Sequence, residues 1–278
     1  MDTKFLKRFI KRKASVVGGV IIIIFIVVAL IGPFLCTQDP LRGDARNKYQ
    51  NPSSEHWLGT DNLGRDTFTR LVYGARITLM VSFSGVMMGT IVGLFFGVIA
   101  GYYGGRVDTI IMRFIDILLA FPGLLLAIAI VAILGNGIFN TMMAIAFYST
   151  PYIARIVRGT VISIRELEYI QACQVIGVSD IAIILFHVIP NSMSQVIVNT
   201  TLNLGTAILT SSSLSFLGLG VQPPHPEWGA IMSQAREVMR STPIAALAPG
   251  VAITMVVMSF SLLGDGLRDA LDPKLKNS

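Results

Sequence analysis

Charged residues are scarce in this sequence: Asp, Glu, Lys and Arg make up only 14% of its 278 residues. Soluble proteins carry about a quarter charged residues, so this composition excludes an ordinary soluble domain. Hydrophobic residues reach 53%, and the mean hydropathy is +0.68. So large an excess of apolar surface must face a solvent other than water, which predicts an integral membrane protein.

Residues suited to chemistry are scarce as well. The two cysteines, Cys36 and Cys173, fall in segments expected on opposite sides of the membrane, so no disulfide is predicted. The three histidines are scattered and form neither HExxH nor a paired Cys/His spacing, so no metal site is predicted. A membrane-embedded hydrolase lacks support, since there is neither a G-x-S-x-G motif nor a pair of carboxylates within an apolar run.

Two classes of ligand are also disfavoured. The net charge is +6, but the basic residues lie at the ends of apolar runs and form no patch interleaved with aromatics, so nucleic acid is not an expected partner. No lysine follows a glycine anywhere in the chain, which excludes a P-loop. The chain is therefore not expected to bind a nucleotide through a P-loop of its own.

Long apolar runs dominate the remainder of the sequence. A helix needs roughly 20 apolar residues to cross a bilayer. The runs predict an all-α membrane protein with six transmembrane helices, at about 16–35, 77–101, 110–134, 138–157, 190–216 and 244–264. The first run could belong to a signal peptide, but it exceeds the usual ~7–15 apolar residues, and a retained helix is the favoured interpretation.

The distribution of basic residues orients these helices. Six of the first thirteen residues are Lys or Arg, which predicts a cytoplasmic N-terminus, and an even number of spans returns the C-terminus to the same side. The predicted organisation is an amphipathic stretch and first helix at 1–35, an extracytoplasmic loop at 36–75, a five-helix core at 76–266 with a cytoplasmic loop at 158–190, and a cytoplasmic tail at 267–278.

The second run contains a glycine at every fourth position. This spacing lets two helices approach closely in lipid, so helix packing is the favoured interpretation, with pore lining as the alternative. The glycines are Gly85, Gly89, Gly93, Gly97 and Gly101.

The third and fourth runs contain prolines, and the third also contains two charged residues. Pro122 and Pro151 remove backbone donors and should kink their helices. Arg113 and Asp116 lie one turn apart near a membrane interface, where the two can satisfy one another or reach water, and a gating role is the alternative.

The fifth run carries polar residues spaced by three and four, which places them on one helix face. Hydrogen bonding between helices and the lining of a water-filled path explain this pattern equally well. The stripe consists of Asn199, Asn203, Thr206, Thr210 and Ser213.

The segment between the fourth and fifth runs, RELEYIQACQVIGVSDIAIILFHVIPN at 165–191, is expected to form a helix, a break at Gly177 and a second helix. It resembles the cytoplasmic loop of binding-protein-dependent ABC permeases, with the pattern EAA, three residues, Gly, nine residues and I-x-LP. Gln171, Ala172 and Cys173 occupy the EAA positions and Pro190 ends the pattern. The spacing is kept, while Gln171 replaces the acid and Cys173 the second alanine.

Three further sequence segments narrow the resemblance to a smaller group of permeases. HWLGTDNLGRDTFTRLVYGARITL at 56–79, SLSFLGLGVQPPHPEWGAIM at 213–232 and LLGDGLRDALDPKLK at 262–276 resemble dipeptide and oligopeptide permeases of the DppC/OppC type. The blocks occur in order over nearly the whole chain. Glutathione and nickel permeases share the pattern, so the substrate stays open among short peptides, glutathione and a metal chelate.

The resemblance implies a type I ABC importer in a bacterial cytoplasmic membrane. It implies four kinds of partner: a second permease subunit, two cytoplasmic ABC ATPase subunits, an extracytoplasmic substrate-binding protein and membrane lipid. ATP and its Mg²⁺ would be bound and hydrolysed by the ATPases, so this chain is expected to bind no cofactor itself and is not expected to be an enzyme. The loop would couple hydrolysis to transport through Glu166, Glu168, Gln171, Ala172, Cys173, Gly177, Asp180 and Pro190.

A different class remains as an alternative: a secondary transporter or channel that works without an ATPase. Such proteins usually place ionisable groups at mid-membrane, whereas the apolar runs here are nearly free of them except near their ends.

Overall fold

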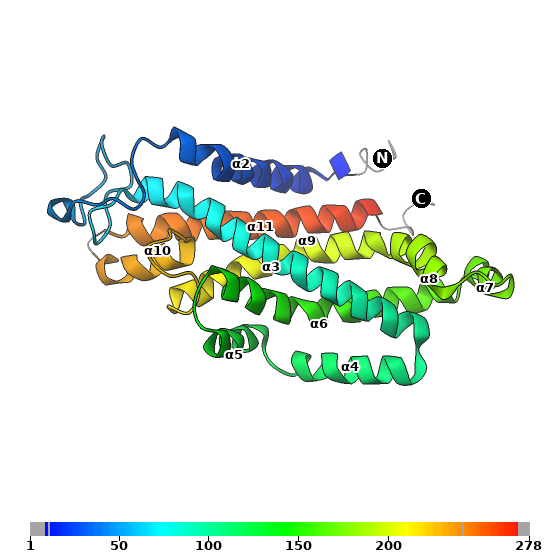
Figure 1. The fold of residues 1–278 in the computed structure, drawn as a ribbon. Helices are drawn as coiled ribbons and strands as arrows, with labels where there is room; N and C mark the ends of the chain where they lie inside the picture. Colours follow the sequence, from blue (N-terminus) through cyan, green and yellow to red (C-terminus); the bar gives the residue numbers. More distant parts are fainter. Residues whose placement is uncertain (1–8, 11, 241, 272–278) are drawn as a thin grey trace.

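The computed structural model describes residues 9–10, 12–240 and 242–271. The predicted N-terminal amphipathic stretch and C-terminal tail therefore lie largely outside the described residues. The chain forms an elongated bundle of helices with no strand among the described residues (Figure 1). The long helices are α2 (Lys13–Leu35), α3 (Thr67–Tyr103), α6 (Ile138–Arg165), α9 (Ile189–Phe216) and α11 (Ile244–Leu271).

Shorter elements connect these helices. They are the 3₁₀ turns η1 (Ala45–Asn47) and η3 (Arg236–Val238), the helices α4 (Gly105–Leu119), α5 (Gly123–Leu134), α7 (Glu168–Val175), α8 (Asp180–Ile183) and α10 (Trp228–Ala235), and a π-helical turn, η2 (Ile184–Val188). One end of the bundle carries the 36–66 loop and α10, and the other end carries α7 and α8 (Figure 1).

All six predicted apolar runs lie in helical structure. By length and composition, four described helical segments can cross a membrane: α2, α3, the continuous stretch from α8 to α9, and α11. A fifth is possible if α4 and α5 together form one span. The remaining predicted span lies in α6, whose 28 residues extend about 42 Å but include Arg155 and Arg158. α6 is thus long enough to cross a membrane, but its composition alone is not apolar enough to identify it as a span.

The third predicted span is not one helix, which corrects the continuous run predicted at 110–134. α4 and α5 meet at an angle of 91°. Pro122 precedes the first residue of α5 and takes an extended backbone (φ −55°, ψ 131°). Proline cannot donate a backbone hydrogen bond and disfavours helical backbone in the residue before it, so α4 ends at this point. Pro151, in contrast, lies within an unbroken α6.

On α4, Asp116 pairs with a residue other than Arg113. Asp116 forms an ion pair with Arg155 of α6 rather than with Arg113. About two turns nearer the start of α4, Asp108 forms a second ion pair with Arg158. These two pairs hold α4 against α6.

The helix that contains the second apolar run begins before that run. Asp66 caps α3, since its carboxylate accepts a hydrogen bond from the Thr69 N–H at 2.7 Å, and the helix therefore starts at Thr67. The preceding loop is a folded cap. Asp61 forms ion pairs with Arg65 at 2.6 Å and with Arg70 at 3.3 Å, and both arginine side chains are buried.

The five glycines of α3 all face α6. A Cβ atom at any of them would lie 2.6 to 2.8 Å from an atom of α6, closer than real Cβ atoms approach. Glycine is therefore required for this backbone separation, because it lets helices pack without intervening side chains. α3 and α6 form a tightly packed pair along most of their lengths.

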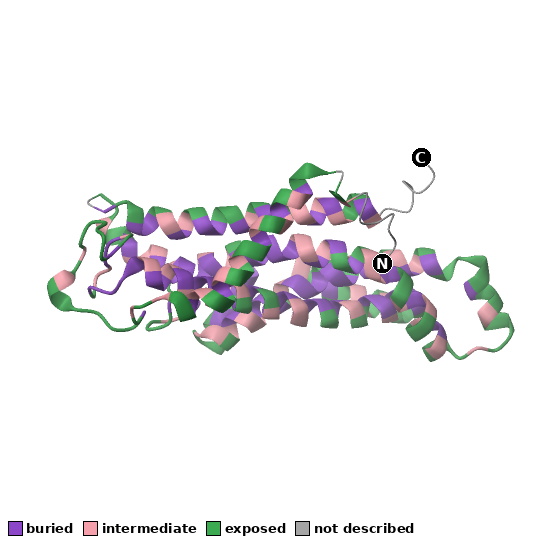
Figure 2. Cartoon of the chain, turned by 90° about the horizontal axis from the view of Figure 1, so that it is seen from above, coloured by how far each residue is buried: buried purple, intermediate pink, exposed green. Residues whose placement is uncertain are grey.

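The described ends of the chain lie at the same end of the bundle as α7 and α8 (Figure 1). Arg12, just before α2, pairs with Asp269 near the end of α11. Figure 2 shows exposed residues alternating with buried ones along the helices. Many exposed side chains of the long helices are apolar, including Ile23, Phe95 and Phe139, as expected for helices that face lipid.

Candidate functional site

The 165–190 segment has the helix, break and helix arrangement that its sequence predicts. α6 ends at Arg165, and α7 follows after two residues. The chain then turns at Gly177, whose φ of +82° lies in the left-handed region that favours glycine. α8 begins three residues later and continues through η2 into α9. The segment therefore projects from the bundle as a short helical hairpin (Figure 1).

Most residues predicted to act in this segment are solvent-exposed. The exposed ones are Glu166, Glu168, Gln171, Ala172, Gly177, Asp180 and Pro190. Neither glutamate forms an ion pair with any described residue. Cys173 differs from the others, since it is half-buried and packs against the core beneath α7.

The tip of the hairpin also exposes large apolar side chains. Val175 is 86% exposed and Ile176 is 76% exposed, and both directly precede the Gly177 turn. Across the turn, Ile181 and Phe186 are 67% and 74% exposed. Contiguous exposed apolar groups on a polar segment are typical of protein interaction sites.

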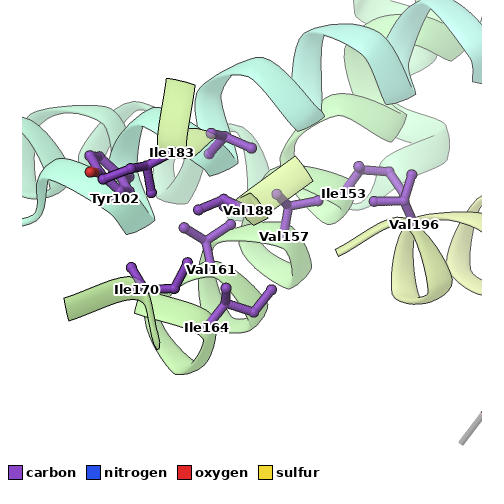
Figure 3. Close-up of a cluster of buried hydrophobic side chains, with 10 residues drawn as sticks. Tyr102, Ile153, Val157, Val161, Ile164, Ile170, Ile183, Val188 and Val196 are labelled. Atoms are coloured by element: carbon purple, nitrogen blue, oxygen red, sulfur yellow. The ribbon is translucent and has the colours of Figure 1, made fainter. Parts of the chain in front are cut away.

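A buried apolar cluster fixes the base of the hairpin to the bundle (Figure 3). Ile170 of α7 and Ile183 of α8 are fully buried, and they pack in the same cluster as Val161 of α6 and Tyr102 of α3. Burying an aliphatic side chain of this size contributes about 1.5–3 kcal/mol. The base of the hairpin is therefore packed against the ends of α3 and α6.

Tyr102 adds a polar link at the same place. Its hydroxyl donates a hydrogen bond to Asp180 Oδ1 at 2.8 Å and accepts one from Gln174 Nε2 at 3.5 Å. Gln174 precedes the Gly177 turn and Asp180 follows it, so one side chain of α3 holds both arms of the hairpin. Tyr102 itself is only 3% exposed.

The polar stripe of α9 does not face a single surface. Asn203 is buried, Thr206 is exposed, and Asn199, Thr210 and Ser213 are half-buried. Each of the hydroxyls donates to a backbone carbonyl of α9 itself, and Asn199 Nδ2 donates to the Gln195 carbonyl. The Thr206 and Thr210 hydroxyls also lie beside the Tyr148 hydroxyl of α6. Hydrogen bonding between helices and the lining of a water-filled path therefore both stay predictions for this stripe.

Part of the stripe borders a cleft of about 360 Å³ between α4, α5, α6 and α9. Asn203 and Thr206 line it from α9, and Tyr148 and Pro151 line it from α6. Ser213 faces a second cleft of about 380 Å³ beside α10 and α11. Three of the five stripe residues thus border two different hollows on the surface of this chain.

Comparison with known proteins identifies the family. Residues 93–277 match the family described as "Binding-protein-dependent transport system inner membrane component", and residues 3–52 match the "N-terminal TM domain of oligopeptide transport permease C". The chain belongs to this family of ABC importer permeases. Because the chain belongs to this family, the secondary transporter, channel and hydrolase alternatives are set aside.

Individual relatives agree with the assignment. The permease is 49% identical over 271 residues to the "Dipeptide transport system permease protein DppC" of Alkalihalophilus pseudofirmus, covering 98% of this chain and 89% of that protein. It is 45% identical over 275 residues to the "Glutathione transport system permease protein GsiD" of Pectobacterium atrosepticum, covering 99% and 91%. The predicted DppC/OppC-type resemblance is therefore confirmed.

Solved structures share the fold at lower identity. An inward-facing structure of the MetNI methionine ABC transporter superimposes with a TM-score of 0.62 at 19% identity, covering 74% of this permease and 97% of that chain. A structure titled as an amino acid ABC transporter with histidines gives a TM-score of 0.55 at 16% identity, covering 71% and 92%. The architecture is that of a type I ABC permease.

Some residues of the permease that bear on the hairpin were not predicted from the sequence. The contact of Tyr102 with Gln174 and Asp180 joins positions more than 70 residues apart and leaves no local pattern. Val175 and Ile176, in contrast, could have been found from the sequence, because two large apolar residues beside a glycine turn are unusual in a polar loop.

Glu227 is a further buried polar residue outside the predicted sites. It is fully buried and accepts hydrogen bonds from the Thr78 and Ser212 hydroxyls and from the Ala230 N–H. Burial raises the pKa of its carboxyl group. Glu227 caps α10 and ties it to α3 and α9, which gives it a structural role.

Proposed function

We propose that this permease forms half of the translocation pathway of an importer of short peptides. Its complex would contain a second permease subunit, two cytoplasmic ATPases and an extracytoplasmic substrate-binding protein. The hairpin end, together with both chain termini, would face the cytoplasm, and the 36–66 cap with α10 would face outward. Lipid would cover the exposed apolar faces of the outer helices.

The observation that carries this proposal is the exposed tip of the 165–190 hairpin. Its apolar residues, Val175 and Ile176, have no described neighbour that covers them. Glu166 and Glu168 are also exposed, just before and at the start of α7, without ion-pair partners among the described residues. A groove with an apolar floor and basic rims would complement this surface, and in this architecture the cytoplasmic ATPase is the subunit that must supply it.

Two sets of contacts would transmit a movement of the hairpin to the membrane helices. The buried cluster of Ile170 and Ile183 connects it to α6, and the Tyr102 hydroxyl connects both of its arms to α3. Because α3 and α6 are in contact at all five glycines, a pull on the hairpin would move them as one body. Rigid-body movement of this kind suits alternating access of a pathway between two subunits.

Short peptides are the proposed substrate because the dipeptide permease relative shares 49% identity over nearly the whole chain. Glutathione is the second candidate, favoured by a relative at 45% identity. Both substrates contain peptide-type amides and free carboxylates. The binding protein, a different chain, would make most of the selection between them.

The test is uptake by the complete complex in reconstituted vesicles. A radiolabelled dipeptide such as alanyl-leucine and labelled glutathione should be compared with the binding protein and ATP present. ATP-dependent accumulation of the dipeptide, and little accumulation of glutathione, is expected. Accumulation of glutathione alone would replace the proposed substrate, and accumulation that does not require ATP would refute an importer driven by ATPases.

A further inference from the structure

An apolar groove lies between α4 and the tightly packed pair of α3 and α6. Its volume of about 590 Å³ lies within the roughly 300–1,000 Å³ of typical ligand pockets. Among the residues that line it, only Thr150 is polar, and its hydroxyl already donates to the Ala146 carbonyl at 2.8 Å. The groove therefore offers almost purely apolar contact. Its walls include Ile110, Phe114 and Leu118 of α4, Val92 and Phe96 of α3, and Phe147 of α6.

α4 itself packs only lightly against the bundle. Ile115 is the one buried residue among its fifteen, all of which the structure describes. Two ion pairs also attach it to α6, Asp108 with Arg158 and Asp116 with Arg155, but both side chains of the second pair are more than half exposed. An exposed ion pair stabilises little. A ligand that fills the groove would supply packing that α4 does not obtain from its own side chains.

The uncompensated charge beside the groove is positive. Arg106 lies one turn before Ile110 on α4, and Arg113 lies one turn after it, so both arginines flank a residue that lines the groove. Both are exposed, and neither forms an ion pair with any described residue. The two acids of α4 are already paired with arginines of α6. A ligand that joins a negative charge to an apolar chain would complement both the arginines and the groove.

A phospholipid has these two parts. The chain is an integral membrane permease, and α4 lies at the outside of the bundle, so an acyl chain can enter the groove from the bilayer (Figure 1). Basic pockets between transmembrane helices bind the headgroups of anionic lipids. Arg106 is in the first turn of α4, at the end of the bundle that carries the hairpin, which places the headgroup in the leaflet on that side. An apolar helix of a partner subunit would instead cover the arginines and leave their charge unpaired, which is costly in a membrane.

We infer that this groove binds an anionic phospholipid, such as phosphatidylglycerol. One acyl chain would lie between Phe96, Phe114 and Phe147, and Arg106 and Arg113, two turns apart, would bracket the phosphate. The lipid would fill the space between α4 and the pair of α3 and α6. The groove is separate from the cleft beside α9, with which it shares only Leu118. The inference goes beyond the proposed function and requires only that the chain lies in a membrane.

Photolabelling of the complete complex in phosphatidylcholine nanodiscs tests this site. The probe is phosphatidylglycerol with a diazirine near the end of one acyl chain, added at a sub-saturating amount. The complex is illuminated without substrate or ATP, digested and mapped by mass spectrometry. Labelling within 92–96, 110–118 or 143–147 is expected. Unlabelled phosphatidylglycerol should suppress this labelling, and the same amount of additional phosphatidylcholine should not.

Charge variants test the headgroup contact. Arg106→Gln and Arg113→Gln should each lower labelling of the groove about fivefold, the range for one basic residue near an anionic lipid. Arg268→Gln is the matched control, because Arg268 is also exposed and without an ion-pair partner among the described residues, but lies in the last turn of α11. The yield and subunit composition of the purified complex show that each variant is folded.

A groove-filling variant tests the acyl-chain contact separately. Val92 lines the groove and is 42% exposed, so Val92→Trp should occupy the space of the acyl chain without disturbing the packing of α3 on α6, and labelling should fall severalfold. Ile91→Trp is its control, since Ile91 is the neighbouring exposed residue and does not line the groove. Labelling of that variant should match wild type.

Three results would each overturn the inference. Labelling could fall outside the groove, or the variants of Arg106, Arg113 and Val92 could behave like their controls. Phosphatidylcholine could compete as well as phosphatidylglycerol, which would show that the arginines select no anionic headgroup. A cysteine at Phe114 could crosslink to the second permease subunit, which would make the groove a subunit interface. None of these results concerns dipeptide uptake, so the proposed function would stand in every case.

Discussion

Replacing Tyr102 with phenylalanine should weaken coupling while leaving the permease folded. The substitution keeps the ring, which is 97% buried in the cluster at the base of the hairpin, and removes only the hydroxyl. Two hydrogen bonds are lost, one to Asp180 at 2.8 Å and one from Gln174 at 3.5 Å. The second is at the limit of hydrogen-bond length and contributes little.

The size of the effect follows from the first bond. A hydrogen bond to a charged acceptor contributes about 1.5–3 kcal/mol. Asp180 is exposed, and water can replace the hydroxyl, so we expect a net loss of about 1 kcal/mol. That loss corresponds to about a fivefold shift between the hairpin held against α3 and the hairpin released from it.

The assay is the ratio of dipeptide transported to ATP hydrolysed in reconstituted vesicles. For Tyr102→Phe this ratio should fall by about two- to fivefold, while assembly and basal ATPase activity stay near wild type. Tyr103→Phe is the matched control, because Tyr103 is the next residue and is 48% exposed. Asp180→Asn keeps an acceptor oxygen for the hydroxyl and should have a smaller effect than Tyr102→Phe. An unchanged ratio in Tyr102→Phe would refute the link between α3 and the hairpin.

Three further predictions follow from the same geometry. Gly177→Trp should abolish transport and substrate-stimulated ATPase activity in a complex that still assembles. Gly105→Trp is the control, because Gly105 also has a positive φ and open space around it, so this variant should be destabilised by a similar backbone penalty of about 1–2 kcal/mol and still transport. Equal transport by both variants would exclude the hairpin from coupling. Gly93→Leu should destabilise the permease by more than about 3 kcal/mol, since its Cβ would lie 2.8 Å from the Thr150 carbonyl oxygen, and a near-normal yield and melting temperature would contradict the packing of α3 on α6. A cysteine at Ser53 should react with a membrane-impermeant maleimide in intact cells and one at Val175 should not; the reverse would invert the proposed orientation.

The sequence allowed the α-helical membrane architecture to be predicted, because each long apolar run has a direct physical meaning. The glycines of α3 and the break at Gly177 were also predictable, since their spacing and residue type are local signals. The 91° bend between α4 and α5 was underestimated as a kink. Pro122 marks its position, but its angle depends on how α4 packs against α6 through Asp108 and Asp116.

Long-range contacts limited the prediction of the sites. Nothing near Tyr102 in the sequence indicates its two partners in the hairpin, and nothing near Tyr148 indicates that it lines the same cleft as Asn203. The polar periodicity of α9 predicts one shared helix face, whereas Asn203 and Thr206 line one cleft and Ser213 lines another. Which helices surround each part of it depends on the tertiary packing.

The central claim, that the tip of the 165–190 hairpin docks on the ATPase, is tested most directly by site-specific crosslinking. Cys36 and Cys173 are first replaced by alanine, and a single cysteine is placed at Val175, with Trp57 in the opposite cap as the control position. In the assembled complex, the cysteine at 175 should crosslink to an ATPase subunit, with a yield that changes on addition of ATP, and the cysteine at 57 should not. Free reaction of the cysteine at 175 with maleimide in the assembled complex, without a crosslink to the ATPase, would contradict the account.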